Sequence, residues 1–301
     1  MKRYLPWLLP AACAAALAPP ASGDFDLFHR AGQGLLSGSW SHTFADPVVQ
    51  VGPLQLVLFG SLGHWVGFVI APALALLVVA AVRSVGVRDP QVLMLIGLLS
   101  ILTGLTSSGI DSGHPADALL PLLWILAASK AHRGKTLSAA VLVGLSAGFE
   151  TWGILGIAVL ALAPRFRSAL PAAALAAGIA AALYLPFILE HQFAMGSYQW
   201  HVSDTSLLSH FVAAGTSIGW PLRILQGGCA LTGGVVLARL ARRSPHVLWL
   251  VPGVVVLVRL LLDPLDSGYY MVGIEAPALV GLALLSLWGA RLPRIAREPL
   301  T

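Results

Sequence analysis

The segment DFDLFHRAGQGLL, which begins at residue 24, holds the first carboxylates of the chain. Asp24, Asp26 and Arg30 follow directly after a hydrophobic N-terminal stretch. A carboxylate can take a proton as a general base, and a guanidinium can hold phosphate oxygens in a bidentate manner. The same residues have structural uses. Asp24 stands where an N-cap would stand, and Asp26 precedes Arg30 by four residues, the spacing of an ion pair on a helix.

A second polar segment, SSGIDSGHPADALLP, opens an apolar run and holds Asp111, His114 and Asp117. A histidine beside two acids could bind a metal ion, but this spacing matches no standard ligand motif. We therefore expect no divalent metal here. Pro115 falls near the first turn of the following helix, where His114 or Asp117 could serve as a cap.

Two later polar segments add arginines and aromatic residues. Arg223 lies early in an apolar run, where its side chain would reach to the headgroups, and Arg259 precedes Asp263 at ion-pair spacing. Either guanidinium could instead hold phosphate oxygens. Aromatic side chains in these segments would contact a ligand or form the interfacial belt of a membrane protein. Trp200, with His201 beside it, and Tyr269 are the candidates.

These polar segments interrupt a very apolar chain. Of the 301 residues, 57% are hydrophobic and 10% are charged, whereas a soluble domain has about 25% charged residues. The composition predicts an all-α polytopic membrane protein with a single transmembrane domain over residues 1–301. The net charge of +5 does not indicate a nucleic-acid partner, because the cations collect at the ends of apolar runs. Cys13 and Cys229 lie inside such runs and indicate neither disulfides nor a thiolate metal site.

The order of charges predicts the membrane topology, and the lipid bilayer is the expected partner. Basic clusters alternate with acidic segments, and by the positive-inside rule the basic clusters face the cytoplasm. The resulting fold has about nine to ten spans and a cytoplasmic N-terminus. The acidic segments, expected outside, are 23–52, 107–117, 190–217 and 263–270. The basic residues, expected inside, are Lys2, Arg3, Arg83, Arg88, Lys130, Arg133, Lys135, Arg165, Arg167, Arg239, Arg242, Arg243, Arg291, Arg294 and Arg297.

The N-terminal residues 1–23 have the basic start, apolar middle and small-residue end of a secretory signal. The apolar stretch of about 19 residues is also long enough to remain as a first membrane helix. We expect it to be retained, and both alternatives leave Asp24 outside the cytoplasm. The next segment is expected to form a short amphipathic helix, because Phe25, Phe28 and Gly32 fall at helical spacing.

The apolar run 137–163 lies between two basic clusters. A single straight helix here would carry Arg165 and Arg167 outside and would reverse every later span. The polar break GFETWG predicts instead a short hairpin of two half-helices of about 13 residues, each about 20 Å long. Such irregular backbone is tolerated in a membrane only against protein or a wet cavity. Glu150 is expected at the tip of this hairpin.

Several of these segments together resemble the GT-C superfamily of membrane glycosyltransferases, most closely the polyprenol-phosphate-mannose-dependent mannosyltransferases of glycosyltransferase family 87. DFDLF with RAGQGLLSG is similar to the family's outer-loop pattern, with Asp24 at its first position. ADPVVQVGPLQLVLFG resembles the proline-rich start of the second span, and the stretch from HPADALLP to APRFR resembles two basic turns around a half-helix. The sequence departs from the family at Glu150, where relatives often have lysine, and at Phe28, where tyrosine is commoner.

The resemblance implies a GT-C-like core over residues 1–189, with the outer loop 23–52, followed by variable C-terminal helices over residues 190–301. It implies inverting transfer of a sugar, with mannose expected, from a polyprenyl-phosphate donor to an envelope glycolipid or glycan outside the bacterial plasma membrane. Asp24 would be the general base, with Asp26 as its rival. The leaving group is a phosphate that cations can stabilise, so no cofactor is required. The residues assigned to the donor phosphate or sugar are Arg30, His114, Asp117, Glu150, Arg223 and Arg259. Those assigned to the acceptor, where an aromatic ring could stack on a sugar, are Trp200, His201 and Tyr269.

A polytopic lipid or small-molecule transporter, such as a flippase, is the competing class, and a nonenzymatic subunit of an assembly is a third. Transporters tend to show internal repeats and polar binding residues near the bilayer midplane in broken helices. This chain shows no convincing sequence repeat, and its charges gather at the expected outer edge. Glu150 and Glu275 are the exceptions that favour a transporter.

Overall fold

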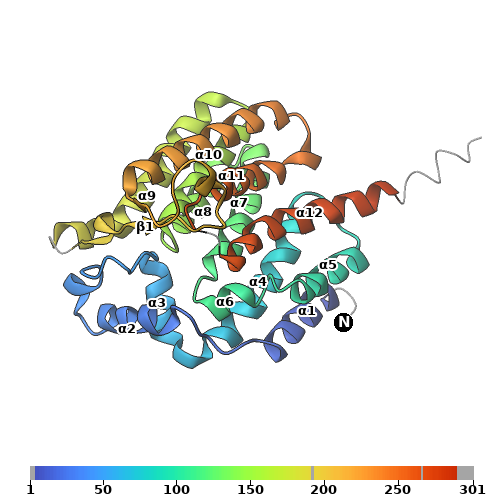
Figure 1. The fold of residues 1–301 in the computed structure, drawn as a ribbon. Coiled ribbons are helices and arrows are strands. Elements are labelled where there is room, and N and C mark those ends of the chain that lie inside the picture. The colour runs from blue at the N-terminus through green and yellow to red at the C-terminus, as the bar shows by residue number, and fades with distance from the viewer. Residues whose placement is uncertain (1–3, 191–192, 266, 290–301) are drawn as a thin grey trace, which may run out of the picture.

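The computed structural model describes residues 4–190, 193–265 and 267–289. Almost all of its regular structure is helical, and the helices pack side by side (Figure 1). The expectation of an all-α protein is confirmed apart from two very short strands. Part of the predicted charge pattern lies outside the described residues, namely Lys2, Arg3, Asp266, Arg291, Arg294 and Arg297.

The first half of the chain forms short and medium-length helices. They are α1 (Leu5–Ala16), α2 (Phe25–Leu36), α3 (Pro53–Leu62), α4 (Val66–Ser84), α5 (Pro90–Leu102), α6 (Ser108–Ser112) and α7 (Ala116–His132), with 3₁₀ turns η1 (Trp40–His42) and η2 (Gly63–Trp65). Local chemistry sets several boundaries. Pro53 and Pro90 stand at the start of α3 and α5, where a missing N–H costs nothing. The Asp89 carboxylate caps α5 by accepting a hydrogen bond from the Gln91 backbone N–H at 2.8 Å.

Helix α2 is the amphipathic helix that the spacing of its apolar residues predicts. Phe25, Phe28 and Gly32 are buried, and the helix packs against α3. A side chain larger than glycine does not fit at position 32, because a Cβ there would lie 2.1 Å from the Leu56 carbonyl oxygen. The close packing of α2 on α3 therefore fixes the helix end at which Asp24 stands.

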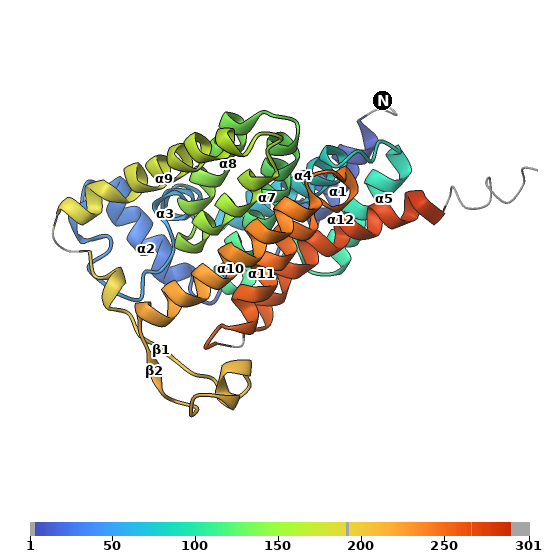
Figure 2. The ribbon, with the colours of Figure 1, turned by 90° about the horizontal axis from the view of Figure 1, so that it is seen from above.

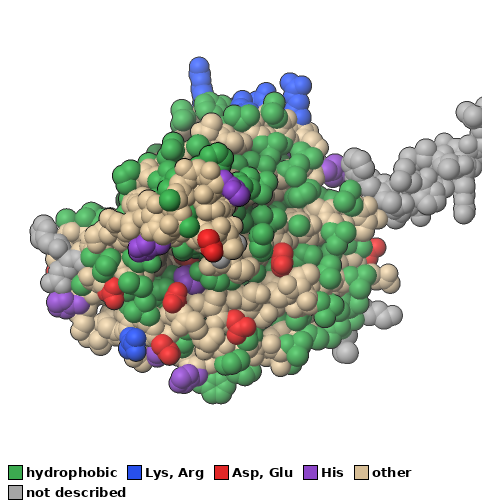
Figure 3. All heavy atoms as spheres, in the orientation of Figure 1, with side chains coloured by type: hydrophobic (Ala, Val, Ile, Leu, Met, Phe, Trp, Pro, Cys, Tyr) green, Lys and Arg blue, Asp and Glu red, His purple; other side chains and the backbone are tan. Residues whose placement is uncertain are grey.

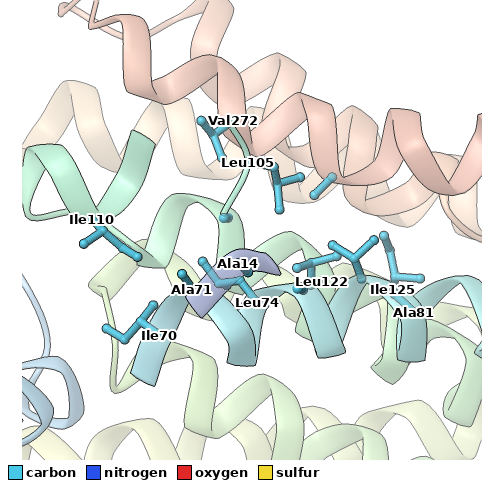
Figure 4. Close-up of a cluster of buried hydrophobic side chains, with 14 of the residues drawn as sticks. Ala14, Ile70, Ala71, Leu74, Ala81, Leu105, Ile110, Leu122, Ile125 and Val272 are labelled. Atoms are coloured by element: carbon cyan, nitrogen blue, oxygen red, sulfur yellow. The ribbon is translucent and has the colours of Figure 1, made fainter. Parts of the chain in front are cut away.

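Apolar side chains from distant parts of the chain meet in a buried cluster (Figure 4). Ala14 of α1, Leu122 of α7 and Val272 of α12 (Val272–Gly289) belong to it. The last helix thus packs against helices from the start of the chain. Ile110 belongs to the same cluster, so the core also anchors the loop that leads into α7.

The apolar run 137–163 divides into two helical segments at its polar break, as predicted. α8 (Thr136–Ala147) ends before the break, and η3 (Thr151–Leu162) packs against it. The turn between them is tight, since a Cβ on Gly153 would lie 2.3 Å from the Ser146 carbonyl oxygen. The second segment is a 3₁₀ helix rather than an α-helix. At about 2.0 Å per residue it rises further than an α-helix of the same length, which rises about 1.5 Å per residue.

The second half of the chain consists of long helices and a small β-hairpin. The elements are α9 (Phe166–Leu189), η4 (Met195–Ser197), β1 (Trp200–His201), η5 (Leu207–His210), β2 (Ser217–Ile218), α10 (Trp220–Ala241), η6 (Pro245–Val247), α11 (Leu250–Leu261) and η7 (Gly268–Met271). The hairpin was not expected from the sequence. Trp200 pairs with Ile218 and His201 with Ser217 in antiparallel register. Figure 2 shows the hairpin projecting from the helices beside the start of α10.

Four helical stretches among the described residues are long and apolar enough to cross a membrane. They are Pro53–Ser84, Phe166–Leu189, Trp220–Ala241 and Gly268–Ser286. Five shorter apolar helices are Leu5–Ala16, Pro90–Leu102, Thr136–Ala147, Thr151–Leu162 and Leu250–Leu261. On the face in Figure 3, most Lys and Arg side chains gather along one edge, whereas acids and histidines are spread over the rest. Helix lengths and charge separation together favour a polytopic membrane protein.

Candidate functional site

A cavity of about 500 Å³ is lined by residues from both halves of the chain. Its walls come from α2, α7, η3, α10 and α11, with the loop before α3, the β-hairpin and η7 contributing as well. The fold therefore assembles a site from positions far apart in the sequence. The predicted site residues that line the cavity are Asp24, His114, Asp117, Glu150, Trp200, Arg223, Arg259 and Tyr269.

Three predicted site residues do not line this cavity, namely Asp26, Arg30 and His201. Asp26 and Arg30 are exposed on α2. The ion pair expected between them is absent from this described part of the chain, so that expectation was wrong. Exposed ion pairs contribute little energy, so helical spacing alone does not hold two long side chains together. His201 is exposed on the hairpin and contacts the Ser217 hydroxyl at 3.2 Å.

Three side chains of the cavity wall, Asp24, His114 and Glu150, form a bridge, which we call the histidine bridge. His114 Nε2 lies 3.0 Å from Asp24 Oδ2, and His114 Nδ1 lies 3.3 Å from Glu150 Oε1. An ionised carboxylate only accepts hydrogen bonds, so two such partners require a proton on each ring nitrogen. His114 is therefore an imidazolium in this arrangement.

The bridge shifts the acidity of its members. The hydrogen bond from His114 lowers the pKa of Asp24 below its ordinary value of 3.8, against the opposing effect of partial burial. Burial alone would lower the pKa of His114, but the hydrogen bonds to Asp24 and Glu150 outweigh it and raise this pKa from 6.5 to about 10. Asp24 is thus held ionised and His114 is held protonated across the physiological pH range.

Backbone contacts bring Asp24 to His114. Gly23 and Gly113 both have positive φ angles, 60° and 84°, which glycine adopts without strain. A Cβ on Gly23 would lie 2.7 Å from the Ser112 carbonyl oxygen, and a Cβ on Gly113 would lie 2.7 Å from the Phe25 nitrogen. Asp24 stands at the N-cap position of α2, as predicted, but its carboxylate makes no capping hydrogen bond and binds His114 instead.

The turn between α8 and η3 carries Glu150 to the cavity, where the predicted tip lies. Its backbone pairs with the loop before α3, because Gly52 N–H donates to the Phe149 carbonyl oxygen at 2.6 Å and residue 150 bridges to Val51. Glu150 is buried, and its second carboxylate oxygen accepts a hydrogen bond from the Trp152 indole N–H. The tip is therefore held by main-chain and side-chain contacts together.

The cavity wall also holds Arg223 and Arg259, which we call the arginine pair. Asp263 joins them: its Oδ2 lies 2.8 Å from Arg223 Nη1 and 3.8 Å from Arg259 Nη2. The predicted pairing of Arg259 with Asp263 is confirmed, and Asp117 Oδ1 also lies 3.8 Å from Arg259 Nη1. Arg223 was expected to reach to the headgroups, and its sequence neighbourhood offers no acid; its partner Asp263 stands forty residues later in the chain.

Aromatic rings cover both guanidinium groups. Arg223 lies 4.5 Å from the centre of the Trp200 ring, and Arg259 lies 4.2 Å from Trp152 and 5.0 Å from Tyr270. These distances are those of cation–π contacts. One face of the Trp200 ring, a candidate for stacking on a sugar, thus carries an arginine.

Several residues of the site were missed by reasoning from the sequence. Gln226 donates from Nε2 to the Arg259 carbonyl oxygen and accepts from Arg223 Nη1 at 2.9 Å. Its position three residues after Arg223, on the same face of α10, was the available signal. Trp152 stands two residues after Glu150 in the polar break and could have been noted there. Tyr270 had no signal beyond the aromatic content of its loop.

Tyr269 lines the cavity and also packs against the histidine bridge. Its ring stacks on His114 with 4.9 Å between centres and 3° between planes, and Phe28 meets His114 edge-on at 5.4 Å. The face of the Tyr269 ring that meets His114 is therefore covered by the histidine. Over the residues that the structure describes, no three His, Cys, Asp or Glu side chains are grouped as a metal ion would need.

Fold and site together define a nearly all-helical chain with several potential membrane helices and a cavity lined by charged residues. No family model, no curated protein and no solved structure matches the chain.

Proposed function

We propose that this protein is a membrane glycosyltransferase of the GT-C type, which moves a sugar from a polyprenyl-phosphate donor to an envelope glycolipid or glycan. We propose mannose as the sugar. One observation carries the proposal: the same cavity is lined by an ionised carboxylate, Asp24, and by a guanidinium with unused hydrogen-bond donors, Arg259. These are the two groups that transfer from a lipid phosphate needs, a base and a cation for the leaving group.

Asp24 is the proposed base. Its carboxylate takes the proton of the acceptor hydroxyl while that oxygen attacks the anomeric carbon. The bond from the anomeric carbon to the phosphate oxygen breaks, and the lipid phosphate leaves with the bonding pair. The displacement inverts the anomeric configuration. A phosphate is a stable leaving group, so the reaction as proposed needs neither a second carboxylate acting as an acid nor a cofactor.

Arg259 is the proposed centre of the phosphate site. Its side chain is 8% exposed and lies between two carboxylates at 3.8 Å, with Trp152 and Tyr270 against it. Within the described ranges its guanidinium makes no hydrogen bond, although it carries five donors. Arg223 supports the same site, since Asp263 holds it beside Arg259. A phosphate oxygen entering the cavity would find donors that are already oriented.

The proposal places the chain in a bacterial plasma membrane, crossing it about nine to ten times. The basic helix ends would face the cytoplasm and the cavity would open outside, with α8 and η3 as a hairpin that enters and returns. The apolar helices and the charge separation in Figure 3 support this orientation.

The proposal is tested with purified protein, radiolabelled polyprenyl-phosphate mannose and envelope glycolipids. Wild type is expected to form a labelled glycolipid, and Asp24→Asn is expected to lose about 10²- to 10⁴-fold in rate because its amide cannot take the proton. Asp204→Asn is the matched control, since this acid is exposed and does not line the cavity.

Two results would contradict the proposal. Transfer that survives Asp24→Asn would remove Asp24 as the base. Donor that moves between the leaflets of a vesicle without any transfer, in wild type and variant alike, would instead indicate a flippase.

A further inference from the structure

His114 was expected to bind the donor, but its polar atoms are already engaged. Nε2 faces Asp24 at 3.0 Å and Nδ1 faces Glu150 at 3.3 Å. One ring face lies on Tyr269, and the side chain is 14% exposed. The imidazolium has two N–H donors, and each has a carboxylate partner. The ring therefore has no donor left for a phosphate or a sugar hydroxyl.

We propose that His114 is a positioning residue, an imidazolium fixed by Glu150 and Tyr269 that holds one oxygen of Asp24 and leaves the other to take the acceptor's proton. This role rests on the proposed function. Asp24 Oδ1 has no hydrogen-bond partner among the residues the structure describes, whereas Oδ2 is held by His114. The two oxygens of one carboxylate thus have separate tasks.

The arrangement solves a problem that the exposure of Asp24 creates. The Asp24 side chain is 58% exposed, and a freely rotating carboxylate would face the acceptor hydroxyl in only a fraction of its orientations. Misplacing a reacting group by about 1 Å can cost about 100-fold in rate. His114 is 14% exposed and Glu150 is 9% exposed, so the buried part of the bridge orients the exposed part.

The titratable groups that face His114 come from several elements. Asp24 precedes α2, Asp117 lies in the first turn of α7, Glu150 precedes η3, and Tyr269 belongs to η7. All the acids among them favour the protonated ring. The proton taken from the acceptor goes to Asp24 Oδ1, while His114 keeps both of its protons throughout the step. His114 therefore orients the base without exchanging protons with the substrate.

The kinetic test is His114→Gln in the transfer assay, with His29→Gln as the matched control. His29 is a partly buried histidine of α2 that contacts the Phe59 carbonyl oxygen and does not line the cavity. His114→Gln is expected to lower kcat about 100-fold while the donor KM changes by less than about threefold. Thermal unfolding of both variants shows whether each is folded.

The pH profile and the KM distinguish positioning from donor binding. Without His114, Asp24 loses the hydrogen bond that keeps it ionised, so the acidic limb of the rate profile should move to higher pH. A kcat close to that of wild type with a donor KM raised by more than about tenfold would overturn the inference and leave the proposed function standing.

A measurement that needs no reaction tests the bridge itself. In protein with ¹⁵N-labelled histidine, His114 should show two protonated ring nitrogens at about pH 8, where an ordinary histidine is neutral. Its signal is assigned by its absence from His114→Gln, and Asp24→Asn or Glu150→Gln should lower the pH at which it titrates. A neutral ring in wild type would overturn the inference. If wild type showed the imidazolium signal of His114 but transferred no sugar, the proposed function would be overturned instead. The catalytic part of the role of His114 would then fall with it.

Discussion

Asp24 and Arg259 line the same cavity, yet the Asp24 side chain is 58% exposed and the Arg259 side chain only 8%. The histidine bridge is a line of short contacts that runs from the buried Glu150 out to Asp24. The arginine pair is an enclosed cluster in which Asp263, itself 0% exposed, touches both cations. Charge is compensated in both arrangements, but only the bridge ends in an exposed group.

The difference follows from what each arrangement is proposed to bind. A base must be reached by the acceptor hydroxyl, so the Asp24 end of the bridge stays open. A phosphate site gains from exclusion of water, because electrostatic attraction is stronger in a low-dielectric site. The burial of the arginine pair has a structural consequence too. Loss of Arg259 leaves the buried Asp117 without its cation, whereas loss of Asp24 leaves His114 its partner Glu150.

The largest effect on stability is expected from Arg259→Met. Asp117 and Asp263 would lose their shared cation, and breaking a buried ion pair in this way costs about 3–5 kcal/mol. The free energy of unfolding, measured in one detergent for all variants, checks this. Arg259→Lys is the control, since it keeps the charge but replaces the planar guanidinium that lies against Trp152 and Tyr270. The free energy of unfolding of Arg259→Lys should lie between those of wild type and Arg259→Met. If Arg259→Met were as stable as wild type, the described network would be contradicted.

Arg223→Met is expected to have the next largest effect. Arg223 donates a charged hydrogen bond to Asp263 at 2.8 Å and is 14% exposed, and a hydrogen bond to a charged group contributes about 1.5–3 kcal/mol. Asp263 keeps Arg259, so less is left uncompensated than in the first variant. If Arg223→Met were the more destabilising of the two, Arg223 rather than Arg259 would be the structural centre of the pair.

The sequence predicts those parts of the site that depend on local pattern. The apolar spacing of α2 and the polar break that carries Glu150 to a tip are local features, and both are confirmed. The pairing of Arg259 with Asp263 has helical spacing and is found. Composition likewise predicts a nearly all-helical chain. Inside a lipid bilayer there is no water for the backbone N–H and C=O groups, so they must pair with one another, as they do in a helix.

The parts that the sequence could not predict depend on contacts between distant segments. Nothing near His114 indicates that Asp24 and Glu150 meet it from two sides, since the approach depends on close backbone contacts at Gly23 and Gly113. Arg223 appeared unpaired for the same reason. The short hairpin at Trp200 was missed because two-residue strands leave too little alternation to detect.

The pH dependence of stability is expected to reveal the histidine bridge. The pKa of His114 is about 10 in the folded protein and 6.5 as its ordinary value. Between these values the folded state binds a proton that the unfolded state lacks, so stability falls as pH rises. The stabilisation is complete below about pH 6.5 and is lost through about pH 10. The melting-temperature difference between wild type and His114→Gln should shrink over this window, and a constant difference would contradict the bridge.

The smallest effect is expected from Trp200→Leu, which tests where the arginine pair ends and the acceptor site begins. A cation–π contact contributes about 0.5–2 kcal/mol, so stability should fall by about 1 kcal/mol as Arg223 loses the ring beneath it. Since one Trp200 face already carries Arg223 at 4.5 Å, the acceptor KM should rise only modestly. His201→Ala removes a neighbour on the same strand that does not line the cavity, and its effect on KM should be smaller still. An equal or larger rise for His201→Ala would mean that the acceptor lies along the exposed hairpin, and the cavity would then hold the donor alone.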